Sequence, residues 1–275
     1  MDAERPIGVF DSGLGGLTVV RALRQRLPGE HIVYLGDTAR LPYGTKSPET
    51  VGYYSLKSAR FLLEREVKML LVACNTASAS ALPLLERELP VPVLGAVGPG
   101  AETAVAATRS GQVGVIGTLT TVRSGAYPQA IAARDARVRV VQLACPLLVP
   151  LAEEGWLGDG GAQLEIQAAE AVVRRYLAEL HEAAPNLDVL VLGCTHYPLL
   201  QPLLDRVARS LWRHEVRLVD SARAMAQAAA RALGERRRPA DNGRLECYVT
   251  DEARLGEVGG RFLGQPLGSV EKVDL

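Results

Sequence analysis

The sequence predicts an α/β fold of two pseudo-symmetric, doubly wound domains with mainly parallel sheets. Three observations predict it. Short apolar runs rich in β-branched residues alternate with Ala-, Leu- and Arg-rich stretches of helical spacing. The apolar runs are almost unbroken, which is typical of parallel strands covered by helices on both faces. An internal repeat also gives the two halves of the chain equivalent motifs.

The apolar runs predict eight strands, at residues 7–10, 31–35, 69–73, 91–96, 113–116, 138–143, 189–192 and 216–219. Helical spacing predicts six clear helices, at residues 17–25, 50–65, 76–88, 161–184, 199–210 and 222–233. Pro28 and Gly29 end the first of these helices. The alternation of the two element types indicates an α/β fold.

The internal repeat pairs residues 6–13 with 112–119, 35–37 with 143–145, and 70–76 with 190–196. Each half therefore carries a cysteine, Cys74 or Cys194, at the end of its third strand. Ligands of such sheets bind beyond the carboxyl ends of the strands. We therefore expect both cysteines in an active site in the cleft between the two domains.

The length of the chain also favours two domains, because a single core stops growing efficiently below about 300 residues. We expect the first domain to comprise residues 1–97 and 213–275 and the second to comprise 98–212. In this division the strand and helix from Val216 onward return to complete the first domain.

Composition excludes several classes of protein. Lys+Arg (31) balances Asp+Glu (31), so charge gives no case for a nucleic-acid partner. The start lacks the features of a secretory signal, and no apolar run is long enough for a membrane span, so we expect a cytoplasmic protein. The four cysteines form no Cys-x-x-Cys pair, which indicates free thiols and no metal site.

The two matched cysteines suit the removal of a proton from a weak carbon acid. A proton that returns on the opposite face of the carbon needs a second acid opposite the first base. The pKa of a thiol, about 8.5, falls near a helix N-terminus, and each cysteine precedes a predicted helix. A single buried cysteine more often fills a core. Two cysteines at matched positions favour a catalytic pair.

Three further motifs lie on the predicted loops. The glycine-rich turn from Asp11 to Gly16 offers backbone N–H groups to a carboxylate or phosphate, but Asp11 would repel a phosphate, so this carboxylate suits the substrate ammonium or the tuning of Cys74. The segment Pro42-Tyr43-Gly44 is typical of an ordinary turn. His196 is either an acid/base partner of Cys194 or an orienting donor, although a lone histidine is more often structural.

Six segments, in order along most of the chain, together resemble the glutamate racemases of the aspartate/glutamate racemase superfamily. They are Asp11-Ser12-Gly13-x-Gly15-Gly16-Leu17-Thr18-Val19, Gly36-Asp37-Thr38-Ala39-Arg40-x-Pro42-Tyr43-Gly44, Ala73-Cys74-Asn75-Thr76-Ala77, Ser124-Gly125-Ala126-Tyr127, Ala144-Cys145-Pro146-Leu147 and Gly193-Cys194-Thr195-His196-Tyr197-Pro198-Leu199.

The resemblance implies interconversion of L- and D-glutamate without a cofactor or a metal. Cys74 would deprotonate D-glutamate and Cys194 would deprotonate L-glutamate, and D-glutamate would supply peptidoglycan synthesis and so cell-wall biogenesis. Family members are often cytoplasmic homodimers. Gly98 departs from the family, which often has a charged residue there, and we expect a looser interdomain connection as a result.

The resemblance also implies roles for individual residues. Asp11 would assist Cys74 and His196 would assist Cys194 in catalysis. Asp37 and Glu153 would influence catalysis without touching the substrate. The implied substrate-binding residues are Asp11, Ser12, Pro42, Tyr43, Gly44, Asn75, Thr76, Thr118, Thr195 and His196.

Four alternatives stay open at this point. A pyridoxal-dependent racemase would need a Schiff-base lysine, and of the four lysines only Lys46 lies near the candidate site; the others are Lys57, Lys68 and Lys272. A cysteine hydrolase would use Cys74 and His196 but would leave Cys194 without a role. An aspartate racemase or one-cysteine isomerase would share the chemistry. A two-lobed amino-acid-binding protein would bind glutamate without catalysing exchange.

Overall fold

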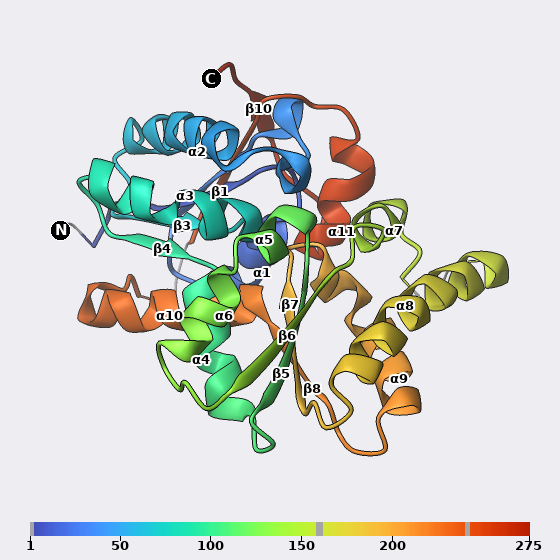
Figure 1. Cartoon of the computed structure of the whole chain (residues 1–275). Coiled ribbons are helices and arrows are strands. Elements are labelled where there is room, and N and C mark those ends of the chain that lie inside the picture. Colours follow the sequence, from blue (N-terminus) through green and yellow to red (C-terminus); the bar gives the residue numbers. More distant parts are fainter. Residues whose placement is uncertain (1–2, 158–161, 240–242) are drawn as a thin grey trace. The chain divides into compact units, whose positions relative to one another are not determined.

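The computed structural model describes residues 3–157, 162–239 and 243–275 (Figure 1). The chain forms two compact α/β units, here called unit 1 (Met1–Ala96 with Ala222–Leu275) and unit 2 (Val97–Ser221). The predicted fold class, α/β with parallel sheets, is confirmed. None of the helices in the described ranges combines the length and the apolar character that a membrane span requires.

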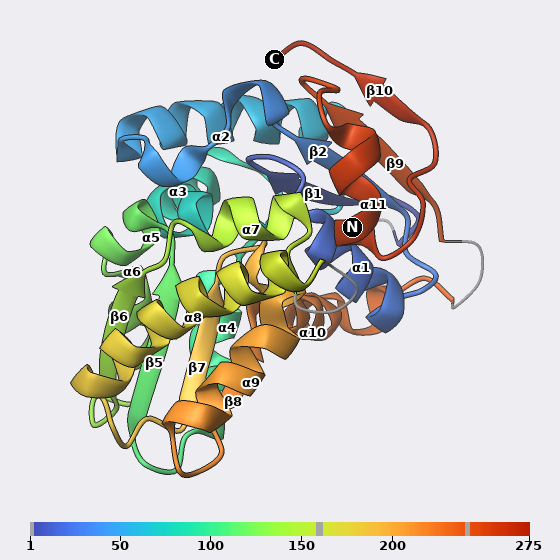
Figure 2. The same cartoon turned by 90° about the vertical axis from the view of Figure 1, so that its right-hand side faces the viewer.

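Unit 1 contains a six-stranded sheet of order β10-β9-β2-β1-β3-β4, in which every neighbouring pair is parallel. Its central strands are entirely buried, which explains their unbroken apolar sequence. Helices α2 and α3 pack together on one face, and α1 packs with α11 on the other (Figure 2). The strands are β1 Ile7–Asp11, β2 Ile32–Gly36, β3 Met69–Val72, β4 Val93–Gly95, β9 Leu245–Val249 and β10 Val270–Lys272. The helices are α1 Leu17–Arg26, α2 Pro48–Leu63, α3 Asn75–Glu88, α10 Ser221–Leu233 and α11 Gly260–Leu263.

Unit 2 contains a four-stranded parallel sheet of order β6-β5-β7-β8. Helices α4 and α6 cover one face and α8 and α9 cover the other (Figures 1 and 2). The strands are β5 Gln112–Gly117, β6 Arg139–Ala144, β7 Val189–Gly193 and β8 Arg217–Asp220. The helices are α4 Val97–Ala107, α5 Leu119–Arg123, α6 Ala126–Ala132, α7 Leu148–Glu154, α8 Gln163–Ala183 and α9 Gln201–Leu211.

The internal repeat is visible in the strand order. In each unit the first strand lies between the second and the third, and the fourth lies outside the third, giving β2-β1-β3-β4 and β6-β5-β7-β8. Parallel strands joined by right-handed crossovers produce this order twice from equivalent sequences. The loops after β3 and β7, which carry the two candidate cysteines, therefore occupy equivalent places in their own units.

The strand expected at residues 216–219 does not complete unit 1. It is β8, and it pairs in parallel with β7, with Leu190 opposite Leu218. The expected return into unit 1 begins one element later, with α10, and continues through β9 and β10. The repeat explains the difference, because β8 is the counterpart of β4 and completes the second four-stranded set. The predicted helix start at Gly161 lies outside the described residues.

Several elements gave too little sequence signal to be predicted. Strand β9 has the charged residue Glu246 at its second position, and β10 is short and polar. Helix α4 contains Gly98, Pro99 and Gly100, which are poor helix formers. A close contact explains Gly100, since a Cβ there would stand 3.1 Å from the ring of Tyr127. Tertiary packing thus overrides local propensity at this helix.

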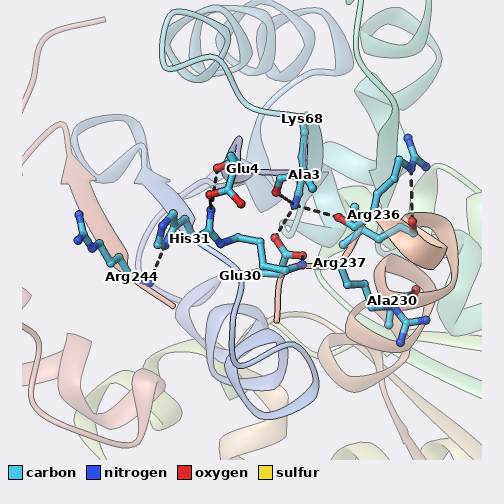
Figure 3. Close-up of polar contacts among 11 residues, drawn as sticks. Ala3, Glu4, Glu30, His31, Lys68, Ala230, Arg236, Arg237 and Arg244 are labelled. Atoms are coloured by element: carbon cyan, nitrogen blue, oxygen red, sulfur yellow. Dashed lines mark hydrogen bonds and ion pairs between the residues drawn. The ribbon is translucent and has the colours of Figure 1, made fainter. Parts of the chain in front are cut away.

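A buried ion pair fastens the amino ends of the strands in unit 1 (Figure 3). Lys68 Nζ lies 2.6 Å from Glu30 Oε2, and both side chains are 1% exposed. Lys68 also donates to the carbonyl of Ala3, and the backbone N–H of Arg238 donates to Glu30 Oε1 at 3.0 Å. The pair therefore links the starts of β2 and β3 to the segment that follows α10.

Candidate active site

Cys74 lies at the carboxyl end of β3 and is the N-cap residue of α3. Its Sγ accepts a hydrogen bond from the N–H of Ala77 at 3.4 Å and donates one to Ser12 Oγ at 3.4 Å. The side chain is buried, with 5% of its surface exposed. A sulfur at a helix N-terminus is stabilised as a thiolate by the amide dipoles. The environment of Cys74 therefore suits a proton acceptor.

Asp11 ends the neighbouring strand β1 and is 1% exposed. Its Oδ2 accepts the N–H of Gly13 at 3.0 Å, and the hydroxyl of Tyr34 donates to the Gly13 carbonyl at 2.6 Å. The turn can exist only with a glycine at position 16, where a Cβ would stand 2.4 Å from Asp11 Cβ. Close packing therefore fixes this carboxylate and Ser12 at the carboxyl edge of the sheet, beside the end of β3.

The loop after β2 brings the next predicted residues to the same edge. The Tyr43 hydroxyl donates to Asp37 Oδ2 at 2.6 Å, and Arg40 donates to Asp37 Oδ1 at 2.8 Å. The Leu41–Pro42 peptide bond is cis, and Gly44 lies in the short 3₁₀ turn that follows. Burial first, and the Asp37 carboxylate second, raise the pKa of Tyr43, so that its phenol stays a hydrogen-bond donor.

Asn75 and Thr76 open helix α3 directly after Cys74. Both side chains are 2% exposed, and both residues belong to the first turn of the helix. Backbone N–H groups in a first helical turn bind anions readily. These two residues therefore extend the polar edge formed by Asp11, Ser12 and the Tyr43 loop.

Cys194 follows β7 in unit 2 and is 6% exposed. Its Sγ lies 3.9 Å from His196 Nδ1, and Thr195 Oγ1 lies 3.4 Å from the same nitrogen. The other ring nitrogen, Nε2, lies 3.0 Å from Glu153 Oε1 on α7. The three side chains Cys194, His196 and Glu153 therefore form a continuous chain of polar contacts.

Opposing influences act on the protonation of His196. Burial alone lowers its pKa, but hydrogen bonds to Cys194 and Glu153, together with the charges of those two groups, raise the pKa to about 10. At neutral pH the ring is therefore an imidazolium cation. This cation lies 3.9 Å from the Cys194 sulfur, where it can assist a proton transfer.

Thr118 lies at the carboxyl end of β5, next to β7 in the sheet. It is the N-cap of α5, and its Oγ1 accepts the N–H of Thr121 at 3.3 Å. The strand registers place Phe10 opposite Val72 and Ile116 opposite Leu192, so Thr118 is the counterpart of Ser12, and Gly117 is the counterpart of Asp11. Unit 2 therefore repeats the hydroxyl of unit 1 but not its carboxylate, and its ionisable side chain beside the sulfur is His196.

The predicted site residues form two groups, one in each unit. Unit 1 brings together Asp11, Ser12, Asp37, Pro42, Tyr43, Gly44, Cys74, Asn75 and Thr76. Unit 2 brings together Thr118, Glu153, Cys194, Thr195 and His196. Within the described ranges no three His, Cys, Asp or Glu side chains are arranged to hold a metal ion.

Sequence reasoning missed some of the residues that shape the site. Tyr34, within β2, and Thr250, directly after β9, contact the turns around Asp11 and Asp37, but neither residue belongs to a recognisable motif. In unit 2 the Tyr197 hydroxyl donates to the carbonyl of Cys145 at 2.9 Å and so ties the loop after β6 to the loop after β7. Glu153 was expected at a distance from the substrate, but its direct contact with His196 was not expected.

A pyridoxal-dependent enzyme would need one lysine in the site, and two of the four lysines of this chain make contacts elsewhere. Lys68 is buried in the ion pair at the opposite, amino edge of the sheet. Lys57 donates to the carbonyl of Leu275 and lies over the ring of Tyr53. Lys272 is an exposed residue of the edge strand β10. Among the four, Lys46 follows the Tyr43 turn, as the sequence suggested.

Comparisons with known proteins agree with the resemblance predicted from the sequence. Residues 8–229 match the family model described as Asp/Glu/hydantoin racemase. The chain is 51% identical to a glutamate racemase of Geobacter metallireducens, over 98% of this chain and 97% of the relative.

Solved structures give the same result. A crystal structure of glutamate racemase from Thermus thermophilus, in complex with β-chloro-D-alanine, is similar with a TM-score of 0.86 and 44% identity over 100% of this chain and 99% of that chain. A glutamate racemase from Francisella tularensis, in complex with D-glutamate, has a TM-score of 0.87 and 34% identity over 99% of this chain and 98% of that chain. This chain therefore belongs to the glutamate racemases of the Asp/Glu/hydantoin racemase family.

Proposed function

We propose that this protein interconverts L- and D-glutamate by a cofactor-independent mechanism in which Cys74 and Cys194 are the two bases. One observation carries the proposal: each unit places a buried cysteine at the end of its third strand, beside polar groups that can assist a proton transfer. The relative from F. tularensis was crystallised with D-glutamate, which supports the choice of substrate.

In the direction from D to L, the Cys74 thiolate takes the α-proton of D-glutamate. The electron pair of the broken C–H bond moves onto the α-carboxylate, where N–H and hydroxyl donors stabilise the developing charge. The Cys194 thiol then gives its proton to the opposite face of the carbon, and the imidazolium of His196 stabilises the thiolate that remains. The reverse direction exchanges the roles of the two sulfurs.

The polar groups of both units would hold the substrate. Asp11 suits the ammonium group, because it is a buried carboxylate beside Ser12 and the Cys74 loop. The donors for the two carboxylates of glutamate would be hydroxyl, amide and backbone groups of Ser12, Pro42–Gly44, Asn75, Thr76, Thr118 and Thr195. In this proposal Asp37 and Glu153 act by holding Tyr43 and His196.

The D-glutamate product would serve the synthesis of peptidoglycan, as the family resemblance implies. Assembly as a homodimer also belongs to this proposal, and sedimentation of the purified protein would test it. We expect no requirement for pyridoxal phosphate, and the addition of this cofactor is therefore part of the experiment below.

The experiment follows L- and D-glutamate in heavy water by optical rotation and α-deuterium content, with and without pyridoxal phosphate. We expect racemisation with deuterium incorporation in both directions and no effect of the cofactor. Racemisation that requires the cofactor, or glutamate binding without α-hydrogen exchange, would contradict the proposal. A faster rate on aspartate than on glutamate would replace the proposed substrate.

The first prediction concerns the two sulfurs. Because each direction uses both, Cys74→Ser and Cys194→Ser each lose racemisation in both directions by a factor on the order of 10²–10⁴, since a hydroxyl ionises far less readily than a thiol. Cys247→Ser is the matched control: burial raises the pKa of this β9 thiol to about 11, so it has no role as a base. Full turnover in either catalytic variant would exclude the two-base mechanism.

A further inference from the structure

The loop that carries Tyr43 and Gly44 is fastened from behind by the strand that returns near the end of the chain. Thr250 follows β9 directly and is 6% exposed. Its Oγ1 donates to Asp37 Oδ1 at 3.0 Å and accepts the N–H of Ala39 at 2.8 Å. Its own N–H donates to the carbonyl of Gly36 at 3.1 Å. One threonine thus makes two hydrogen bonds to the loop after β2 and one to the last residue of β2.

A second threonine completes this connection. Thr38 Oγ1 donates to the carbonyl of Asp251 at 2.6 Å, and the N–H of Asp251 donates back to Thr38 Oγ1 at 2.7 Å. The two segments are 213 positions apart in the sequence, so only the folded chain joins them. Together these bonds hold the residues around Asp37 against the carboxyl end of β9.

Asp37 connects Thr250 to the loop that carries Tyr43 and Gly44. Its side chain is fully buried. Its Oδ1 accepts hydrogen bonds from Thr250 and Arg40, and its Oδ2 accepts one from the Tyr43 hydroxyl at 2.6 Å. Burying a carboxylate costs free energy unless hydrogen bonds satisfy it, so the hydrogen-bond donors around Asp37 fix the orientation of its side chain. Arg40 is itself held, because its other nitrogen donates to the carbonyl of Leu275 at 3.0 Å.

We propose that Thr250 is a positioning residue for substrate binding: it holds Asp37, which holds Tyr43 and the Pro42–Gly44 backbone in the conformation that accepts a substrate carboxylate. The inference rests on the proposed function, because that function assigns this loop to glutamate. Thr250 itself touches neither the sulfurs nor, in the mechanism above, the substrate. Its effect is therefore on KM and not on proton transfer.

The decisive variant is Thr250→Val, which keeps the shape of the side chain and removes its hydroxyl. We expect KM for both enantiomers to rise about tenfold, the loss typical of one hydrogen bond to a charged group, with kcat within about threefold of wild type. Thr250→Ser restores the hydroxyl and should restore KM. If the valine variant does not fold, Thr250→Ala adds no volume and makes the same test.

The chain offers a matched control in Thr108→Val. Thr108 Oγ1 donates to Asp188 Oδ1 at 2.6 Å, which is the same chemical pair, but it lies at the amino end of β7, the edge opposite to Cys194. We expect this variant to lower the melting temperature and leave KM unchanged. A Thr250→Val variant that behaves as this control does would overturn the inference, because the hydroxyl would then be merely structural.

Two further readouts show whether Thr250 acts through Tyr43. In a double-mutant cycle with Tyr43→Phe, the double variant should have a KM no higher than the worse single variant, because both changes break one chain of contacts. Multiplied effects on KM would contradict the proposal. Backbone amides of residues 41–45 should also exchange hydrogen faster in Thr250→Val than in wild type and in Thr108→Val.

The outcomes separate this inference from the proposed function. A wild-type protein that does not racemise glutamate removes the proposed function, and amide exchange then decides whether Thr250 orders the loop. A wild-type protein that racemises glutamate, together with an unchanged KM in Thr250→Val, leaves the function intact and refutes the positioning role alone.

Discussion

The two candidate bases have different partners, although they occupy equivalent positions. The contacts of Cys74 include the N–H of Ala77 and the hydroxyl of Ser12. Cys194 is beside His196, which Glu153 holds through its second ring nitrogen. The asymmetry means that a change of pH acts on the two sulfurs through different neighbours.

The second prediction follows from the pKa of His196. Its folded-state pKa, about 10, is above the ordinary value of 6.5, so its stabilising contribution is fully present below about pH 6.5 and is lost as the pH rises through 10. In Glu153→Gln the pKa of His196 should fall, and the loss of stability should move to lower pH. NMR titration of the ring and urea unfolding at pH 6 and pH 9 measure both effects.

Glu154→Gln is the control for this variant, since it removes the same charge from the neighbouring, exposed position. We expect it to leave the titration of His196 unchanged. An equal pKa of His196 in wild type and in Glu153→Gln would show that the ion pair does not set the protonation of this ring.

At the scale of the elements, the candidate site and the contacts that stabilise the sheet lie at opposite edges of each sheet. The carboxyl ends of the strands carry the candidate site, and the amino ends carry polar contacts that stabilise the sheet. In unit 1 the support is the pair Lys68–Glu30. In unit 2 it is Asp188, whose carboxylate accepts hydrogen bonds from Thr108 and from the N–H groups of Arg109 and Ser110. The support is therefore remote from the predicted chemistry.

The third prediction tests this separation. Lys68→Met leaves Glu30 buried without its cation and should lower the free energy of unfolding by about 3–5 kcal/mol, while kcat and KM of the folded enzyme stay unchanged. Adding Glu30→Leu removes the uncompensated charge and should recover most of the loss. Urea unfolding measures both variants.

An exposed ion pair of the same unit gives the comparison. Arg5 lies 3.4 Å from Glu66, and their side chains are 49% and 74% exposed. Arg5→Met should cost about 1 kcal/mol or less, because solvent screens such a pair. A loss in Lys68→Met no larger than this would show that the buried pair contributes little.

At the scale of the whole molecule, the two units differ in how the chain builds them. Residues 97–221 supply all four strands of the unit 2 sheet in one continuous segment. Unit 1 needs two separate segments, because β9 pairs with β2 and covers an edge that residues 1–96 alone would leave open. The return of the chain also supplies Thr250 to the loop after β2.

The fourth prediction follows from this difference in connectivity. A fragment of residues 97–221 should unfold cooperatively in urea, whereas a fragment of residues 1–96 should not fold until residues 222–275 are added. Circular dichroism follows both fragments, and fluorescence follows unit 2 alone, because Trp156 and Trp212 both lie in it. Cooperative unfolding of residues 1–96 by themselves would contradict this account.

The sequence by itself determined the fold class, the first eight strands of the chain to within a few residues, and the groups of residues gathered at each carboxyl edge. These features depend on local signals: apolar runs, helical spacing, and motifs directly after strands. Cys74 and Cys194 could be identified because the same strand-to-helix junction occurs twice.

Only the tertiary structure decided which sheet receives β8, where β9 and β10 pair, that Thr250 supports the candidate site, and that Glu153 contacts His196 directly. The residues concerned have no distinctive local pattern, because their roles come from partners far away in the sequence. Thr250 is an ordinary strand-end threonine until the fold brings Asp37 within 3.0 Å of its hydroxyl. Long-range pairing, unlike periodicity, is a property of the folded chain.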